Sequence, residues 1–188
     1  MKIAITGGIG SGKSYVCRLL EKRGFSIYDC DNAAKQIIAS SAEIQTKLKN
    51  VVGENLYDGK TLNKAVLSQF LLASETNTQK INNIIHPAVA TDFIKSKMCW
   101  MECAILFSSG FDKLVDKVIC ITAPIEVRLE RIINRDGISK HKALEWIDKQ
   151  MPQENVMALS DFVIINDGIT NLDNQIDKVL ASLDIDTH

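Results

Sequence analysis

A glycine-rich run, GGIGSGKS over residues Gly7–Ser14, constrains this chain more than any other feature. The run matches the phosphate-binding pattern G-x-x-x-x-G-K-[ST] and follows the short apolar segment Ile3–Thr6. Glycines lack a Cβ, so the backbone can wrap closely around an anion, and successive N–H groups then form a concave nest. The run therefore predicts a strand, a phosphate-binding P-loop, and a helix that starts near Lys13 with its positive end at the anion.

Two side chains of the run carry its chemistry. The Lys13 ammonium can reach the β- and γ-phosphates of a nucleotide as a mobile point charge, and the Ser14 hydroxyl can ligate Mg²⁺. The loop thus predicts Mg²⁺ and a nucleoside triphosphate, with ATP as the expected one. The residues expected to contact the nucleotide here are Gly8, Ile9, Gly10, Ser11, Gly12, Lys13, Ser14 and Tyr15.

Length and composition are those of an ordinary globular protein. With 188 residues, 46% hydrophobic and 24% charged, the chain can bury a sizeable core in one domain with a small insertion. The net charge of −1 gives no positive field for nucleic acid, and no basic tract marks a membrane surface. The sequence shows no signal peptide and no apolar run of ~20 residues. We therefore expect a cytoplasmic protein with no nucleic-acid or membrane partner.

Cysteine usage fits the same compartment. The five cysteines form no C-x-x-C pair, and the three histidines do not complete a zinc-finger spacing. This pattern predicts buried thiols in a reducing environment, without disulfides or a structural metal. The cysteines are Cys17, Cys30, Cys99, Cys103 and Cys120.

Short apolar segments alternate with helical patterns along the chain, which is typical of a doubly wound α/β fold. The near-continuous apolar character of these segments favours a P-loop NTPase-type, five-stranded parallel sheet flanked by helices. The expected strands are Lys2–Thr6, Ser26–Tyr28, Trp100–Phe107, Lys117–Thr122 and Phe162–Ile165. The expected helices follow the P-loop, fill Asn32–Lys97 and Pro124–Gln150, and end the chain over about Leu172–Leu183.

About seventy residues separate the second and third expected strands, far more than one crossover helix needs. The excess predicts a helical insertion over about residues 33–97, between core segments 1–32 and 98–188. Breaks are expected at Gly53, at Asp58-Gly59 and at His86-Pro87. By analogy at the level of the fold, such an insertion holds the second substrate. For His86, a structural role is favoured over a contact to that substrate, and direct catalysis is the least favoured role.

Two carboxylates, Asp29 and Asp31, end the second expected strand. Ligands of open α/β sheets bind beyond the carboxyl ends of the strands, so these side chains are expected to face the phosphate site. One of them can accept a proton from an attacking hydroxyl or hold a Mg²⁺-bound water, and one can cap the helix that begins at Asn32. We expect Asp31 to act at the reacting groups and Asp29 to be structural.

Three arginines, Arg128, Arg131 and Arg135, are spaced so that they share one face of a helix. This helix runs into the turn signal Asp136-Gly137. Arginine suits a closing lid because its planar fork binds phosphate oxygens in pairs, and closure excludes water. We expect a mobile lid over about residues 128–150, with Arg135 as the arginine that binds phosphate.

An ordered set of short motifs extends over nearly the whole chain, and on these motifs the chain resembles the dephospho-CoA kinase family. The motifs are Ile5–Ser14, Asp29–Lys35, Asp58–Asn63, Ile85–Pro87, Ile105–Phe107, Arg128–Asp136, Gln150–Pro152 and Asp161–Gly168. The P-loop alone would not identify the family, whereas the ordered set is specific.

The resemblance implies transfer of the ATP γ-phosphoryl group to the ribose 3′-hydroxyl of dephospho-CoA, the last step of coenzyme A biosynthesis. It also implies that Asp31 acts at the acceptor hydroxyl, that Lys13 and Ser14 hold phosphate and Mg²⁺, and that Arg135 is a lid arginine. The helical insertion matches the family's CoA-binding subdomain. Asn166 and Gly168 lie where the family's loop approaches adenine.

The chain departs from the family pattern at several positions that bear on acceptor and lid contacts. The departing residues are Tyr15, Lys35, Lys64, Glu102, Ala104, Ser108 and Trp146. Two other functions stay open: a nucleoside or nucleotide kinase of the same architecture, and a non-catalytic ATP-binding regulator. A GTPase is disfavoured because the guanine-recognition pattern N-K-x-D is missing. Nothing in the sequence sets the oligomeric state, for which a monomer is the default.

Overall fold

The computed structural model describes residues 1–185 and divides the chain into two compact units. The first unit, called the core unit below, comprises Met1–Tyr28 and the chain from Met98 onward. The second, called the helical unit, comprises Asp29–Lys97. The sequence placed the corresponding boundaries near residues 33 and 97.

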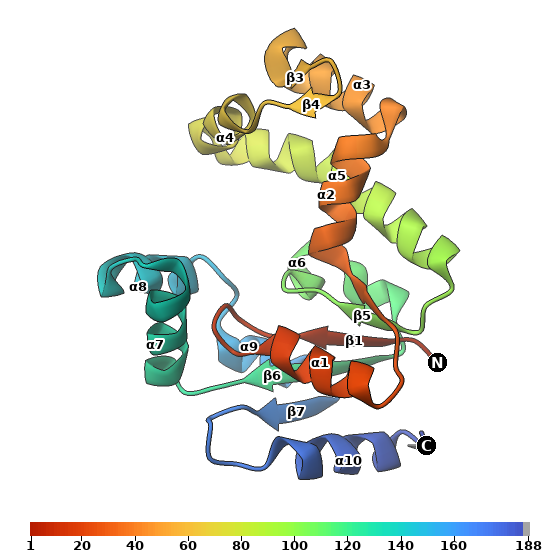
Figure 1. Cartoon of the computed structure of the whole chain (residues 1–188), viewed down its shortest axis with the longest axis vertical. Coiled ribbons are helices and arrows are strands. Elements are labelled where there is room, and N and C mark those ends of the chain that lie inside the picture. The colour runs from red at the N-terminus through yellow and green to blue at the C-terminus, as the bar shows by residue number, and fades with distance from the viewer. Residues whose placement is uncertain (186–188) are drawn as a thin grey trace. The chain divides into compact units, whose positions relative to one another are not determined.

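The core is a five-stranded parallel sheet with the strand order β2-β5-β1-β6-β7, of which Figure 1 labels β5, β1, β6 and β7. The strands are β1 (Ile3–Thr6), β2 (Ile27–Asp29), β5 (Trp100–Glu102), β6 (Lys117–Thr122) and β7 (Phe162–Ile165). Strand β1 lies in the middle, where Ile5 pairs with Glu102 on one side and with Ile119 on the other. The predicted sheet is thereby confirmed.

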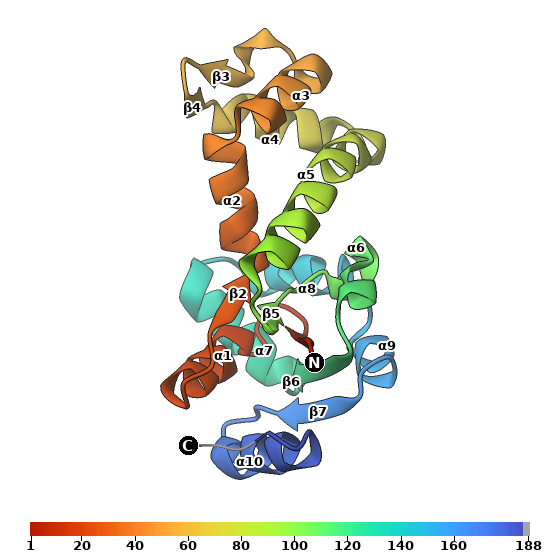
Figure 2. The same ribbon diagram turned by 90° about the vertical axis from the view of Figure 1, so that its right-hand side faces the viewer.

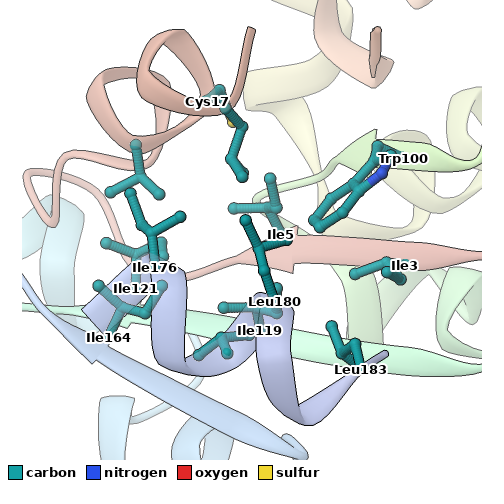
Figure 3. Packing of buried hydrophobic residues seen from close by; sticks show 13 residues of the cluster. Ile3, Ile5, Cys17, Trp100, Ile119, Ile121, Ile164, Ile176, Leu180 and Leu183 are labelled. Carbon is teal, nitrogen blue, oxygen red and sulfur yellow. The ribbon is translucent and has the colours of Figure 1, made fainter. Parts of the chain in front are cut away.

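Two helices, α1 (Lys13–Lys22) and α10 (Leu172–Ser182), cover one face of this sheet. Alternate strand residues share a face, so Ile3 and Ile5 point the same way as Ile119 and Ile121. Figure 3 shows these strand side chains packed with Ile176 and Leu180 of α10. The cluster fixes the carboxyl end of β1, and therefore the start of the P-loop, on a closely packed base.

The remaining elements of the core unit follow the third and fourth strands in sequence. They are α6 (Leu106–Ser109), the 3₁₀ segment η2 (Phe111–Leu114), α7 (Ile125–Asp136), α8 (Lys140–Asp148) and α9 (Gln153–Ala158). Helices α7 and α8 lie side by side (Figure 1). Their contact is apolar, with Leu129, Ile132 and Ala143 buried and Trp146 packed against them.

One predicted strand, Trp100–Phe107, is too long by several residues, because β5 ends at Glu102. The Cys103 N–H still donates to the Ile5 carbonyl, and a helical turn follows from Leu106. The hydroxyls of Ser108 and Ser109 donate to carbonyls three residues earlier, which favours this turn over further strand pairing.

Two smaller expectations also need correction. Cys99, expected to be buried, is exposed, whereas the other four cysteines are buried, and none of the five forms a disulfide within residues 1–185. Helix α9 was not expected, since the predicted helices end at Gln150 and the next predicted element is the strand Phe162–Ile165. Proline is well suited to the start of a helix, and Pro152 here immediately precedes the first residue of α9.

The helical unit contains four long helices and a small hairpin. Its elements are α2 (Cys30–Ser40), α3 (Ala42–Val52), the 3₁₀ segment η1 (Glu54–Leu56), β3 (Tyr57–Asp58), β4 (Thr61–Leu62), α4 (Lys64–Ala73) and α5 (Glu75–Ser96). Helices α2 and α5 pack against each other (Figure 2). The hairpin turns at Gly59, whose φ of 57° suits the predicted break there.

The expected break at His86-Pro87 is wrong, because α5 continues through both residues. An internal proline costs a helix roughly 3 kcal/mol. Helix α5 buries Ile81, Ile85, Val89 and Phe93, which recur every four residues and form one apolar stripe. Burial of this stripe offsets the proline. Within residues 1–185, no helix combines the length and apolar character that a membrane crossing requires.

Candidate active site

The P-loop occupies the carboxyl end of β1, and its backbone requires glycine at two positions in particular. Gly7 has a φ of 144° and lies against the Ile121 carbonyl, so that a Cβ there would collide with backbone. Gly12 has a φ of 88° and lies against the side-chain amide of Asn166. The positive φ values and these close contacts explain why both positions require glycine.

The start of α1 is open toward an anion. Gly12 occupies the N-cap position and no side chain caps the helix. Within residues 1–185, the backbone N–H groups of Gly10, Gly12 and Ser14 have no acceptor. Such N–H groups at a helix N-terminus attract phosphate oxygens. The geometry therefore fits the phosphate nest that the sequence predicted.

Lys13 is folded back over the loop. Its Nζ donates to the Gly7 carbonyl at 2.8 Å and to the Gly8 carbonyl at 3.4 Å. A lysine held on loop carbonyls can turn toward a phosphate with little movement of its stem, because its ammonium is a compact charge on a flexible chain.

Ser14 pairs with a carboxylate that the sequence had marked only as a departure. The Ser14 Oγ donates to Glu102 Oε1 at 3.0 Å, and Glu102 stands at the end of β5 beside the loop. A hydroxyl and a carboxylate are oxygen ligands of the kind that Mg²⁺ prefers. Cys17 lies near Glu102. Burial and the Glu102 carboxylate raise the pKa of the Cys17 thiol, so the thiol stays uncharged beside the carboxylate.

Beside the loop lies a cavity of about 560 Å³, within the usual size range for small-molecule sites. Tyr15, Asn166 and Gly168, all predicted nucleotide contacts, line it together with Leu19 and Arg131. The segment after Asn166 is held by Asp167, whose carboxylate accepts from the N–H groups of Ile169 and Thr170. These hydrogen bonds lower the pKa of Asp167. The cavity can hold a nucleobase and sugar next to the phosphate nest.

The three arginines of α7 have three different partners. Arg128 is buried, donates from Nε to the Ile9 carbonyl at 2.9 Å, and has its pKa lowered by burial. Arg131 donates to the Gly10 and Ser11 carbonyls at 3.4 Å. Arg135, the predicted phosphate ligand, is exposed and pairs with Asp136 at 2.7 Å. The two arginines closer to the helix start therefore touch the loop, and Arg135 does not.

Two side chains that the sequence analysis did not assign to the site also hold the loop. Gln153 Oε1 accepts from the Gly8 N–H at 3.0 Å, and Gln150 Oε1 accepts from the Ile9 N–H at 2.7 Å. Gln150 belongs to the motif Gln150–Pro152 of the family resemblance, but nothing in that motif assigned it to the loop, and Gln153 lies just outside it. Asn166 likewise donates to the Ser11 carbonyl at 2.9 Å, a contact that its predicted place near adenine did not suggest.

The predicted acceptor residues belong to the helical unit. Asp29 caps α2, because its side chain accepts from the Asn32 N–H at 2.9 Å. Asp31 lies exposed in the first turn of the same helix. His86 is partly buried in α5, and this burial lowers its pKa. The structural role expected of Asp29 is thus confirmed, while those of Asp31 and His86 stay predictions.

A phosphate nest at the end of a central parallel strand, a lysine over it and a nucleotide-sized cavity define a P-loop phosphotransferase. A family model described as dephospho-CoA kinase matches residues 1–171. A dephospho-CoA kinase of Bacteroides fragilis is 42% identical over 190 residues, covering 97% of this chain and 93% of that protein. The chain belongs to the dephospho-CoA kinase family.

Solved structures agree with this assignment of the fold. A crystal structure of TT1252 from Thermus thermophilus superposes with a TM-score of 0.82 at 26% identity, covering 97% of both chains. A dephospho-CoA kinase from Campylobacter jejuni has a TM-score of 0.67 at 23% identity, covering 98% of this chain and 96% of that one. The resemblance predicted from the sequence motifs is confirmed.

Proposed function

We propose that this chain transfers the γ-phosphoryl group of ATP to the ribose 3′-hydroxyl of dephospho-CoA, giving coenzyme A and ADP. The observation that carries the proposal is the family match over residues 1–171, which includes both the P-loop and the helical unit. The phosphate nest, with Lys13 folded over it, supports the donor half of this reaction. The reaction is the last step of coenzyme A biosynthesis.

On the donor side, the loop residues bind and neutralise the nucleotide phosphates. The N–H groups of Gly10, Gly12 and Ser14 donate hydrogen bonds to phosphate oxygens in the nest, and Lys13 turns from the loop carbonyls to the β- and γ-phosphates. Tyr15, Asn166 and Gly168 border the cavity for adenine and ribose. Because the transition state of phosphoryl transfer is loose, such positioning and charge stabilisation supply most of the catalysis.

Mg²⁺ is the metal that this site fits. The Ser14 hydroxyl and the Glu102 carboxylate, 3.0 Å apart, are the oxygen ligands that would hold it, directly or through water. When bound with ATP, the ion neutralises charge that develops on the phosphate oxygens. Within residues 1–185 no group of three or more His, Cys, Asp or Glu side chains forms a metal cage, which suits an ion that arrives with the nucleotide.

On the acceptor side, the helical unit supplies Asp31, whose carboxylate orients the 3′-hydroxyl and takes its proton late in the reaction. Arg135 binds phosphate oxygens from the lid, exchanging its pair with Asp136 for the more highly charged phosphate. The protein acts in the cytoplasm on two small molecules, with no nucleic-acid or membrane partner, and a monomer is sufficient for this scheme.

A product assay tests the proposal. The protein is incubated with Mg-ATP and, in separate reactions, dephospho-CoA, adenosine, each nucleoside monophosphate, or no acceptor. Mass spectrometry then detects one added phosphoryl group. We expect addition to dephospho-CoA at its 3′-hydroxyl and little to the others.

Other outcomes of the same assay would overturn the proposal. Preferred phosphorylation of adenosine or a monophosphate would make the chain a nucleoside or nucleotide kinase. ATP binding without a phosphorylated product would make it a non-catalytic ATP-binding regulator.

A further inference from the structure

Three successive peptide groups at the start of the P-loop are each held by side chains from distant parts of the core unit. In the Gly7–Gly8 peptide, the carbonyl accepts from Lys13 and the N–H donates to Gln153. In the Gly8–Ile9 peptide, the carbonyl accepts from the Ser11 N–H at 3.2 Å, and the N–H donates to Gln150. In both peptides the carbonyl faces Lys13 and the N–H faces a glutamine.

The third peptide, Ile9–Gly10, has the opposite orientation. Its carbonyl accepts from Arg128 Nε at 2.9 Å, on the side where the glutamines bind, and its Gly10 N–H has no acceptor within residues 1–185. The N–H and C=O of a trans peptide point in opposite directions, so a donor on the carbonyl dictates where the N–H points. Before Ile9 the peptide carbonyls point toward Lys13, and after Ile9 the peptide N–H points to that side instead.

We propose that Arg128 is a positioning residue that turns the Gly10 N–H into the phosphate nest by holding the Ile9 carbonyl, with Gln150 and Gln153 holding the two preceding peptides in the opposite sense. Arg128 acts through its Nε–H group as a hydrogen-bond donor, without contact to the nucleotide. The Arg128 side chain on α7 thus fixes the orientation of the Gly10 N–H, the first N–H of the nest.

The surroundings of Arg128 support a positioning role. Its side chain is only 5% exposed, which restricts its motion. The Ile9 side chain packs against the apolar cluster of α7 and α8, so the same residue is held through its N–H, its carbonyl and its side chain. Because Gln150 follows α8 and Arg128 lies on α7, both ends of the helix pair are tied to Ile9. The orientation of this loop segment is therefore linked to the position of that pair.

Two substitutions of matched length separate the donor from the charge. In Arg128→Gln, the Nε2 of glutamine takes the place of the arginine Nε, so the N–H donor remains and the charge is lost. In Arg128→Met, a methyl group takes that place, and donor and charge are both lost. Asn134→Met is the control, because it removes from the same helix an exposed amide that has no hydrogen-bond partner within residues 1–185.

The measurement is the dissociation constant of each variant for Mg-ATP and for AMP, with no acceptor present, together with the midpoint of thermal unfolding. Arg128→Met is expected to weaken ATP binding about tenfold or more, as for loss of one hydrogen bond to a charged group. AMP lacks the β- and γ-phosphates, so its binding should change much less. Arg128→Gln and Asn134→Met should bind ATP nearly as the unchanged protein does.

Three results would overturn the proposal. Unchanged ATP binding by Arg128→Met would remove Arg128 from the loop's function. Equal loss in Arg128→Gln and Arg128→Met would show that the charge acts, not the donor. A parallel loss of ATP binding, AMP binding and thermal stability would make the residue merely structural.

A second pair keeps the test decisive if Arg128→Met does not fold. Gln150→Met removes the acceptor for the Ile9 N–H, and Gln150→Glu keeps an oxygen there. We expect the first to weaken ATP binding relative to AMP binding and the second to restore it, and equal loss in both would overturn the proposal. The inference rests on the proposed function only for ATP as the nucleotide. A chain that binds ATP but fails to phosphorylate dephospho-CoA would contradict the proposed function alone.

Discussion

The P-loop and the helical unit differ in the sequence range of their side-chain hydrogen bonds. Side chains that hold the loop come from 119 residues away in Arg128, 141 in Gln150 and 155 in Asn166. In the helical unit, side-chain caps at Asp29, Ser41, Asn63 and Ser74 reach only three residues along the chain. Even the hydroxyl of Tyr57 reaches just 19 residues back, to the Ile38 carbonyl.

This difference in range fits the different roles of the P-loop and the helical unit. A site that stabilises charge during phosphoryl transfer works best when its donors are fixed beforehand, and long-range hydrogen bonds fix the loop from several sides. The helical unit instead combines local helix caps with the packing of α2, α3 and α4 on α5, which buries an apolar stripe. We therefore expect substitutions in the loop to change activity strongly and stability little. In the helical unit, most substitutions should act on stability, with Asp31 as the exception.

The largest expected effect tests that exception. Asp31→Asn keeps the shape of the side chain and removes its charge, so turnover should fall roughly 10²–10⁴-fold, the range for loss of a general base. ATP affinity should change little. Steady-state phosphorylation of dephospho-CoA and equilibrium ATP binding measure the two quantities. Asp29→Asn is the matched control, since asparagine also caps helices well. If Asp29→Asn lost most of its turnover while Asp31→Asn kept it, the roles of the two carboxylates would have to be exchanged.

Lys13→Ala tests the loop itself. Removing one preorganised donor to the transferring phosphoryl group costs roughly 10²–10³-fold in rate. Thermal unfolding should be nearly unchanged, because Lys13 contributes no apolar burial to the core cluster. Lys22→Ala, an exposed lysine at the other end of α1, is the control. Near-normal turnover in Lys13→Ala would exclude the lysine from the mechanism.

A smaller effect is expected at Arg135, which lies outside the hydrogen bonds that hold the loop. Arg135→Lys keeps the charge and loses the planar fork, so turnover should fall about tenfold, as for one hydrogen bond to a charged group. Stability should hardly change, because an exposed ion pair contributes little. Turnover and thermal unfolding of Arg135→Lys and Arg135→Ala, with Asp136→Asn as control, test this. Lost stability with unchanged activity would make Arg135 structural.

A loss of stability alone is expected at Asp29. Asp29→Ala removes the cap of α2 and should lower the free energy of unfolding by about 1 kcal/mol, the typical cost of losing such a cap. Urea unfolding measures it, with Asp29→Asn expected to retain most of the stability. If alanine and asparagine behave alike, the hydrogen bond to the Asn32 N–H contributes nothing.

The smallest effect is a pH dependence in the core unit. The ammonium of Lys117 and the Val118 N–H hold the pKa of Asp161 below its ordinary value. A carboxyl whose pKa is lower in the folded state stabilises the fold above its unfolded pKa of about 4, and this contribution is lost as the pH falls through the folded pKa. The difference in stability between the unchanged protein and Asp161→Asn should therefore shrink on acidification. A constant difference would show that the charge of Asp161 does not matter.

Much of the fold could be predicted because its signals are local. The strands Lys117–Thr122 and Phe162–Ile165 lie where the apolar segments placed them. The strand predicted over Trp100–Phe107 is longer than β5, and its true end could not be foreseen. The apolar pattern continues past Glu102, whereas the hydroxyls of Ser108 and Ser109 stabilise a helical turn there. Helix α5 continues through Pro87 because its apolar stripe is buried, and the helix propensities of the residues alone do not predict that burial.

The site divides in the same way. The P-loop pattern by itself predicted a phosphate-binding loop at the end of the first strand, because the glycines, Lys13 and Ser14 are adjacent in sequence and their chemistry is local. Only the tertiary structure decided which groups hold that loop: Arg128, Gln150, Gln153 and the pairing of Ser14 with Glu102. Those contacts join residues separated by about half the chain or more, and no local pattern encodes a hydrogen bond made only when distant segments fold together.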